Sequence, residues 1–340
     1  MPFDLFSLLF LLLPREIKAG FGKEGDLSRL TMAVLLYHSF AFVSLLAYGI
    51  YHFISATRSF CKPASPSSSG SRSPIAGTGD YIARPYYPLF LSSHLHHIFR
   101  HLPLYLAFLS LLVSIAHHAF LSTVAANRFS SLQTAASLLL FLFIAISLFL
   151  PLSLPPDLIF LLSAVAFALL SSISSAYQPS DLQSKCDSIS SVISAASAAF
   201  SLALAVCPRL FLAELALAVS VSLQGLWSLQ TLLSLYVGGF IPEGCHRLLE
   251  VTDESIRCEL EDSRNRAAAL LDLAFVLHTT LISVIAVIFY AVLTRGSGGG
   301  LPRRYNGGTY EALPTTTSSG GLNDFDHIQM KAITKNSTQA

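Results

Sequence analysis

Long runs of apolar residues constrain this chain more than any other feature of its sequence. A helix needs roughly 20 mostly apolar residues to cross about 30 Å of hydrocarbon. The runs that meet this need predict about seven transmembrane spans, at residues 30–54, 103–121, 132–152, 157–173, 188–206, 210–238 and 267–293. We therefore expect an all-α fold, a multi-pass transmembrane helical bundle over residues 30–295.

The composition agrees with a membrane protein and excludes some partners. Hydrophobic residues make up 53% of the chain and charged residues 12%, whereas soluble proteins carry about 25% charged residues. The formal net charge of +1 gives no electrostatic reason to expect binding of nucleic acid. The lipid bilayer is the expected partner. Oligomeric state, other membrane-protein partners and the compartment, endomembrane or plasma membrane, stay open.

The segments outside the predicted spans differ in character. The apolar run Phe3–Leu13 is too short to span a bilayer, so we expect residues 1–29 to form an N-terminal interfacial segment. Residues 64–78 and the tail 296–340 are rich in Ser, Pro, Gly or Thr. We expect both to be disordered, because such compositions bury too little apolar surface. Residues 242–266 are strongly charged and are expected to form a polar helical loop.

The sidedness of the chain is only weakly encoded. Basic residues close to the first and last spans favour a cytosolic location for the N-terminus and for the loop 242–266. The glycosylation sequon at Asn336 would then lie on the other side. Cys245 and Cys258 share that loop. They form a disulfide if the loop faces a non-cytosolic compartment and are otherwise free thiols.

Histidines are the first candidates for chemistry. His94, His97 and His101 share one face of a predicted helix, which suits a metal site or proton relay. An amphipathic interfacial segment before the second span also explains them, and we favour this interpretation. Facing helices could also use histidine pairs to ligate haem, although no spacing requires a metal or cofactor. The histidines within spans are His38, His117, His118 and His278.

Polar residues inside the spans are the second group of candidates. A charge at the centre of a bilayer costs about 2.5–3.5 kcal/mol on insertion scales, so such groups are functional by default. We place the two interior carboxylates near helix ends, where they reach water or a helix dipole. We expect the amides to bond to neighbouring helices. The candidate intramembrane residues are Glu214, Gln224, Trp227, Gln230, Asp272 and His278.

The C-terminal half resembles a known family. The residues that carry the resemblance are Leu223–Trp227 with Gln230, Ser234–Leu249, Cys258–His278, Tyr310–Pro314 and His327–Ala332. They are similar to the plant branch of the transmembrane protein 45 family, the domain of unknown function 716 proteins. Many relatives carry histidines in the loop after the fourth span, whereas residues 174–187 contain none. The resemblance implies a multi-pass plant membrane protein, sometimes linked to stress or virus responses, without an established activity.

Three hypotheses of function follow. The first, which we prefer at this point, is a non-enzymatic role in membrane organisation, trafficking or stress- or defence-related signalling. The second is a transporter or channel for protons, metal ions or small solutes that uses the intramembrane polar residues. The third is a haem-binding membrane redox protein. We do not expect an enzyme of a soluble type, because no catalytic triad, zinc-protease or nucleotide-binding motif occurs in the sequence.

Overall fold

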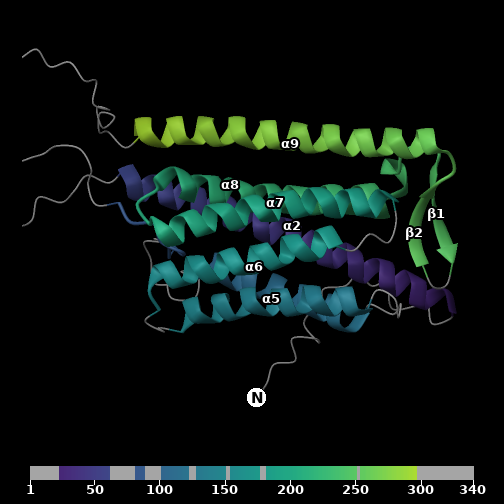
Figure 1. The fold of residues 1–340 in the computed structure, drawn as a ribbon, viewed down its shortest axis with the longest axis horizontal. Coiled ribbons are helices and arrows are strands. Elements are labelled where there is room, and N and C mark those ends of the chain that lie inside the picture. Colours follow the sequence, from purple (N-terminus) through teal and green to yellow (C-terminus); the bar gives the residue numbers. More distant parts are fainter. Residues whose placement is uncertain are drawn as a thin grey trace, which may run out of the picture. The chain divides into compact units, whose positions relative to one another are not determined.

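The computed structural model describes residues 23–61, 81–88, 101–121, 128–150, 154–176, 181–250 and 253–296. Its helices and strands are labelled in Figure 1 where there is room. In chain order they are α2 (Lys23–Cys61), α4 (Leu102–Ala116), the π-helix η2 (His117–Leu121), α5 (Arg128–Phe149), α6 (Pro156–Ala176), α7 (Asp181–Val206), α8 (Phe211–Tyr236), the 3-10 helix η3 (Gly238–Phe240), β1 (Cys245–Glu250), β2 (Asp253–Cys258) and α9 (Glu261–Gly296).

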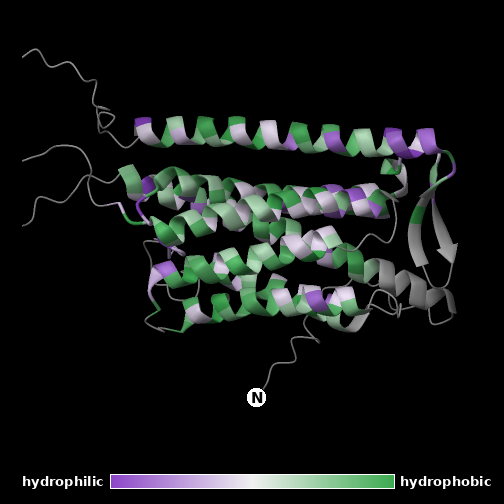
Figure 2. Ribbon diagram, in the orientation of Figure 1, coloured by the Kyte–Doolittle hydropathy of each residue, from purple (hydrophilic) through white to green (hydrophobic). Residues whose placement is uncertain are grey.

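Within the described residues, seven helices are long and apolar enough to cross a membrane. They are α2, α4 with part of η2, α5, α6, α7, α8 and α9. Figure 2 shows apolar residues along their lengths and hydrophilic residues at the end of α9 next to the strands. A helix satisfies all its backbone hydrogen bonds internally, which is why apolar runs of this length fold this way in lipid. The structure confirms the predicted all-α fold class.

Six of these helices form a closed ring. α2 packs against α4, and contacts continue from α4 to α5, α6, α7 and α8, which returns to α2. α9 lies outside the ring and packs against α2, α7 and α8. Most large apolar side chains of α9 are exposed on the protein surface, where the surrounding lipid solvates them. The ring is the part of the fold that can enclose an internal site.

Two glycines bring α2 and α8 into close contact. A Cβ atom added at Gly225 would lie 2.8 Å from the backbone nitrogen of Leu46. One added at Gly49 would lie 2.8 Å from the carbonyl oxygen of Ala218. Both distances are shorter than real Cβ contacts, so only glycine permits this approach. Gly49 and Gly225 therefore mark positions where the backbones of α2 and α8 lie in direct contact.

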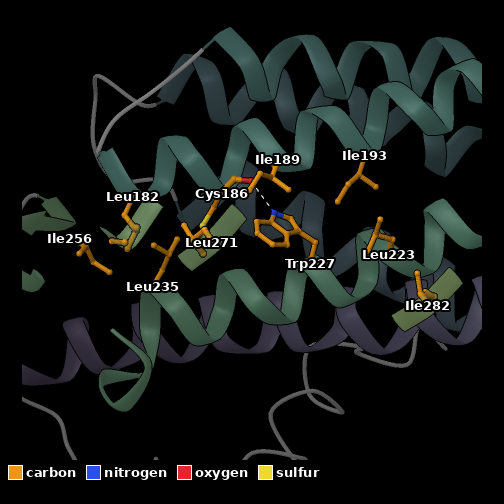
Figure 3. Close-up of a cluster of buried hydrophobic side chains, with 11 residues drawn as sticks. Leu182, Cys186, Ile189, Ile193, Leu223, Trp227, Leu235, Ile256, Leu271 and Ile282 are labelled. Atoms are coloured by element: carbon orange, nitrogen blue, oxygen red, sulfur yellow. Dashed lines mark hydrogen bonds between the residues drawn. The ribbon is translucent and has the colours of Figure 1, made fainter. Parts of the chain in front are cut away.

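Trp227 is the centre of the cluster that joins α7, α8 and α9 (Figure 3). The indole is 1% exposed, and its Nε1–H donates to the carbonyl oxygen of Cys186 at 2.9 Å. Its ring contacts Phe275 of α9 edge-on, with centroids 6.0 Å apart. Buried tryptophans usually satisfy their N–H group in this way. Trp227 thus acts in packing in this structure.

The loop between α8 and α9 corrects one prediction. Residues 242–266 were expected to form a polar helical loop, but β1 and β2 pair antiparallel with Cys245 opposite Cys258. These two cysteines form a disulfide, which settles the alternative that the sequence left open in favour of the bond. Gly244 adopts φ of 82° at the entrance to the hairpin, a conformation that glycine favours. The disulfide thus joins the two strands at the open end of the hairpin, and among the described residues of the predicted loop only those from Glu261 onward are helical, as the start of α9.

Several predictions fall outside the described residues. They concern residues 1–22 of the interfacial segment, the Ser/Pro/Gly-rich loop, the C-terminal tail beyond Gly296, and both His94 and His97. The last residues of the predicted interfacial segment, from Lys23, belong to α2.

Candidate functional site

Glu214 lies at the centre of a buried polar cluster. It is placed in the first turn of α8 and its side chain is 0% exposed. The hydroxyl of Tyr87 donates to Oε1 at 2.9 Å, and the hydroxyl of Tyr81 donates to Oε2. The Nε2 atom of His52 lies 3.2 Å from Oε1, which is an ion-pair distance without the alignment of a hydrogen bond. The carboxylate lies near a helix end, as we expected, but it is buried and held by three side chains, whereas we had expected it to reach water or the helix dipole.

The two tyrosines come from a short segment that crosses the end of the ring. In residues 81–88, the Ala83 N–H donates to the Pro208 carbonyl at 2.8 Å. Tyr48 and Tyr51 of α2 donate to the carbonyls of Pro85 and Tyr87 at 3.1 and 2.7 Å. These bonds satisfy backbone groups of an irregular segment and fix it against α2 and the turn between α7 and α8.

The electrostatics of this cluster keep the tyrosines protonated. Burial, followed by the nearby negative charge of Glu214, raises the pKa of both Tyr81 and Tyr87 above the ordinary tyrosine value. Each hydroxyl is thus held as a donor, and each donor stabilises the ionised carboxylate. The cluster can act chemically as a buried acceptor of a proton or cation, with His52 as its neighbour.

A cavity of about 460 Å³ lies inside the ring, lined by all six ring helices and by Pro85. Apolar side chains such as Leu111, Phe141 and Val221 line it, together with polar groups. No residue of α9 is among the described residues that line it. A cavity of this size and mixed character is typical of sites for small ligands.

Four polar atoms at this cavity are buried and have no hydrogen-bond partner. They are Nε2 of His52, Nε2 of His118, Oγ of Ser201 and Oε1 of Gln224, all from residues that line the cavity. Buried polar groups in proteins are almost always satisfied by protein, water or ligand. The arrangement therefore indicates a cavity that holds water or a polar ligand rather than an empty apolar space.

Asp187 of α7 is the lining carboxylate that the sequence reasoning missed. It is the only Asp, Glu, Lys or Arg among the described residues that line the cavity. It lies inside the apolar window Leu182–Val206, whereas the predicted span began one residue after it. A search for carboxylates in the helical turns on either side of each apolar run, and not only within the run, would have found this residue.

The histidines within spans divide into two places. His117 stacks on Tyr37 with centroids 4.8 Å apart, and His38 and His118 lie 4.7 and 5.3 Å from the same ring. His278 is on α9, where Nδ1 lies 2.7 Å from the carbonyl oxygen of Ala274. Among the described residues, no three His, Cys, Asp or Glu side chains are grouped to hold a metal ion.

The other predicted residues are dispersed. Gln224 donates from Nε2 to Ser190 of α7 at 2.7 Å, as expected for an amide between helices. Gln230 was also expected to bond to a neighbouring helix but donates to Ser234 of its own helix at 2.9 Å, since residues four apart face each other on a helix. Asp272 of α9 forms an ion pair with Lys185 of α7, with Oδ1 and Nζ 2.7 Å apart. His101 caps α4 and its ring stacks on Tyr86. Of the six intramembrane candidates, only Gln224 lines the cavity.

The seven apolar helices define the class, a multi-pass helical membrane protein, and its ring of six helices surrounds a cavity of mixed polar and apolar lining. Residues 156–291, from α6 to near the end of α9, match the family of unknown function DUF716. No curated protein matches the chain.

Proposed function

We propose that this protein binds and transports a small solute through the cavity inside its helical ring. The observation that carries the proposal is a group of three polar atoms around that cavity, on His118, Ser201 and Gln224, which have neither a hydrogen bond nor an ion-pair partner. A protein that acted only through packing would gain nothing from burying such atoms, since each costs about 1–3 kcal/mol. The transport hypothesis therefore takes precedence over the structural role that the sequence alone favoured.

Uptake into proteoliposomes tests this function. The panel contains a neutral polyol, an organic cation and an organic anion, each small enough for the cavity. We expect at least one solute to enter faster than into protein-free liposomes. Ser201→Leu should abolish that uptake, because it fills the cavity at a hydroxyl that makes no hydrogen bond.

Ser283→Leu is the matched control for this experiment. It makes the same exchange on an exposed face of α9, outside the ring, and should leave uptake unchanged. Equal uptake with and without protein for every solute, or no effect of Ser201→Leu, would refute transport through the cavity.

We also propose that the chain is a plant member of the transmembrane protein 45 family. The match over residues 156–291 supports this assignment, together with the resemblance of the tail segments. A part in membrane organisation, trafficking or stress- and defence-related signalling rests on that resemblance alone. No described contact specifically favours the haem-binding alternative, since His38, His117 and His118 gather around the ring of Tyr37.

Finally, we propose a sidedness opposite to that favoured by the basic residues. The Cys245–Cys258 disulfide supports a non-cytosolic location for the hairpin, because disulfides persist in oxidising compartments. An odd number of spans then puts the C-terminal tail in the cytosol. The membrane itself is either a plasma membrane or an endomembrane with an oxidising lumen.

A further inference from the structure

We infer that the solute bound in the cavity is a small organic cation, such as a protonated amine with an apolar body, and that Asp187 is its counter-ion. This inference rests on the proposed function and specifies its substrate class. It follows from three observations: the charges of the residues that line the cavity, the unpaired carboxylate of Asp187, and the arrangement of polar and apolar side chains on the cavity wall.

The charge inventory of the cavity favours a cation. Asp187 is the only formally charged side chain among the described lining residues, and neither Lys nor Arg is present there. Because Lys and Arg are absent from the described lining residues, an anionic solute would meet no permanently charged cation there. A desolvated charge is accepted only when an opposite charge accompanies it.

Asp187 lacks the kind of partner that two other acidic residues of the bundle, Glu214 and Asp272, possess. Glu214 receives two tyrosine hydroxyls, and Asp272 pairs with Lys185. Asp187 forms no hydrogen bond or ion pair with any described residue. A carboxylate left unpaired within an apolar span is costly, which points to a counter-charge brought by the solute.

The walls near Asp187 suit an ammonium group and its apolar substituent. Tyr37 lines the cavity within electrostatic reach of the Asp187 charge, and its ring stacks on His117. Ser190, one turn along α7, provides a hydroxyl on the same side of the helix. Farther along the ring, Phe141 and Val221 supply apolar wall. Together these groups match an amphipathic cation better than an inorganic one.

The test measures how fast a cysteine in the cavity reacts with charged and neutral methanethiosulfonates. Ser190→Cys places the thiol one helical turn from Asp187, about 5–6 Å away between Cβ atoms. Cys61, Cys186 and Cys207 are replaced by alanine, and the two disulfide cysteines do not react. Rates with trimethylammonium-ethyl, sulfonatoethyl and hydroxyethyl reagents are each divided by the rate with a free thiol in water.

We expect the cationic reagent to react about tenfold or more faster than the anionic one, because the nearby carboxylate attracts one and repels the other. Asp187→Asn should bring that ratio close to one. It should not unfold the protein, because the carboxylate bonds to no described residue. Asp272→Asn is the matched control, since it removes a paired carboxylate outside the ring and should leave the ratio unchanged.

Binding of a defined probe gives a second readout. Benzyltrimethylammonium should raise the thermal unfolding temperature of the intact protein, whereas its uncharged carbon isostere neopentylbenzene should raise it far less. Asp187→Asn should remove the difference between the two compounds.

The outcomes separate the two claims. A reactive neutral reagent with a charge ratio near one, or with a ratio unaffected by Asp187→Asn, overturns the cation inference and leaves a solute-accessible cavity. Failure of the neutral reagent to react overturns the proposed function, and the inference with it.

Discussion

Gly225→Ala tests whether α2 and α8 pack as closely as the structure has them. The added Cβ would lie 2.8 Å from the Leu46 nitrogen and 3.1 Å from the Phe42 carbonyl oxygen, both backbone atoms that cannot rotate away. Restoring ordinary contact at the nitrogen requires the helices to separate by about 0.6 Å locally. Overpacking of this kind costs about 1–3 kcal/mol.

Alanine also has a higher helix propensity than glycine, by about 1 kcal/mol in water. That gain is small here, because membrane helices remain helical when they separate. We expect a net loss of about 2 kcal/mol, which corresponds to a fall in the unfolding temperature of roughly 4–8 °C for a domain of this size. Thermal unfolding in detergent, followed by circular dichroism, measures it.

The chain offers its own control. Gly239→Ala makes the same chemical change in η3, where a Cβ would meet nothing within 4 Å, and should leave the unfolding temperature unchanged. The reasoning is refuted if Gly225→Ala unfolds at the same temperature as Gly239→Ala.

Three further predictions concern the Tyr87 hydrogen bond, the Lys185–Asp272 ion pair and the sidedness of the chain. Tyr87→Phe removes a donor to the buried Glu214 carboxylate and should lower the free energy of unfolding by about 1–3 kcal/mol. The pKa of Tyr87 is raised in the folded state, so its contribution to the free energy of unfolding is fully present below the unfolded pKa of about 10. That contribution is lost as the pH rises through the folded pKa, and the Tyr87→Phe variant should show no such loss. Lys185→Gln and Asp272→Asn should couple by less than about 1 kcal/mol in a double-mutant cycle, since the side chains are 32% and 56% exposed, and stronger coupling would indicate a desolvated pair. Asn336 should stay unglycosylated in cells, and a mass shift removed by a glycosidase would reverse the proposed sidedness.

The helices could be predicted from sequence because each satisfies its own backbone and needs only a sufficiently long apolar run. The bond from Gln224 to a neighbouring helix followed from the same physics, since an amide in hydrocarbon must find a partner. Gln230 did not follow it, because Ser234 offers an acceptor one turn away on its own helix.

The candidate site was largely beyond prediction. The bond between Tyr81 and Glu214 joins residues 133 positions apart, and no periodic pattern encodes such a contact. Tyr81 follows a Ser/Pro/Gly-rich stretch whose composition gives no sign of a docked segment. Asp187 was missed for a different reason. A span defined by its apolar residues ends at the first charged residue, so a charge at its boundary is left outside it.

The position of Trp227 has a mechanical consequence. Its indole holds the carbonyl of Cys186, the residue immediately before Asp187, and its opposite contact is with Phe275 on the lipid-facing α9. Because the Cys186 carbonyl belongs to the peptide unit that precedes Asp187, a single rigid side chain links the backbone at Asp187 to α9.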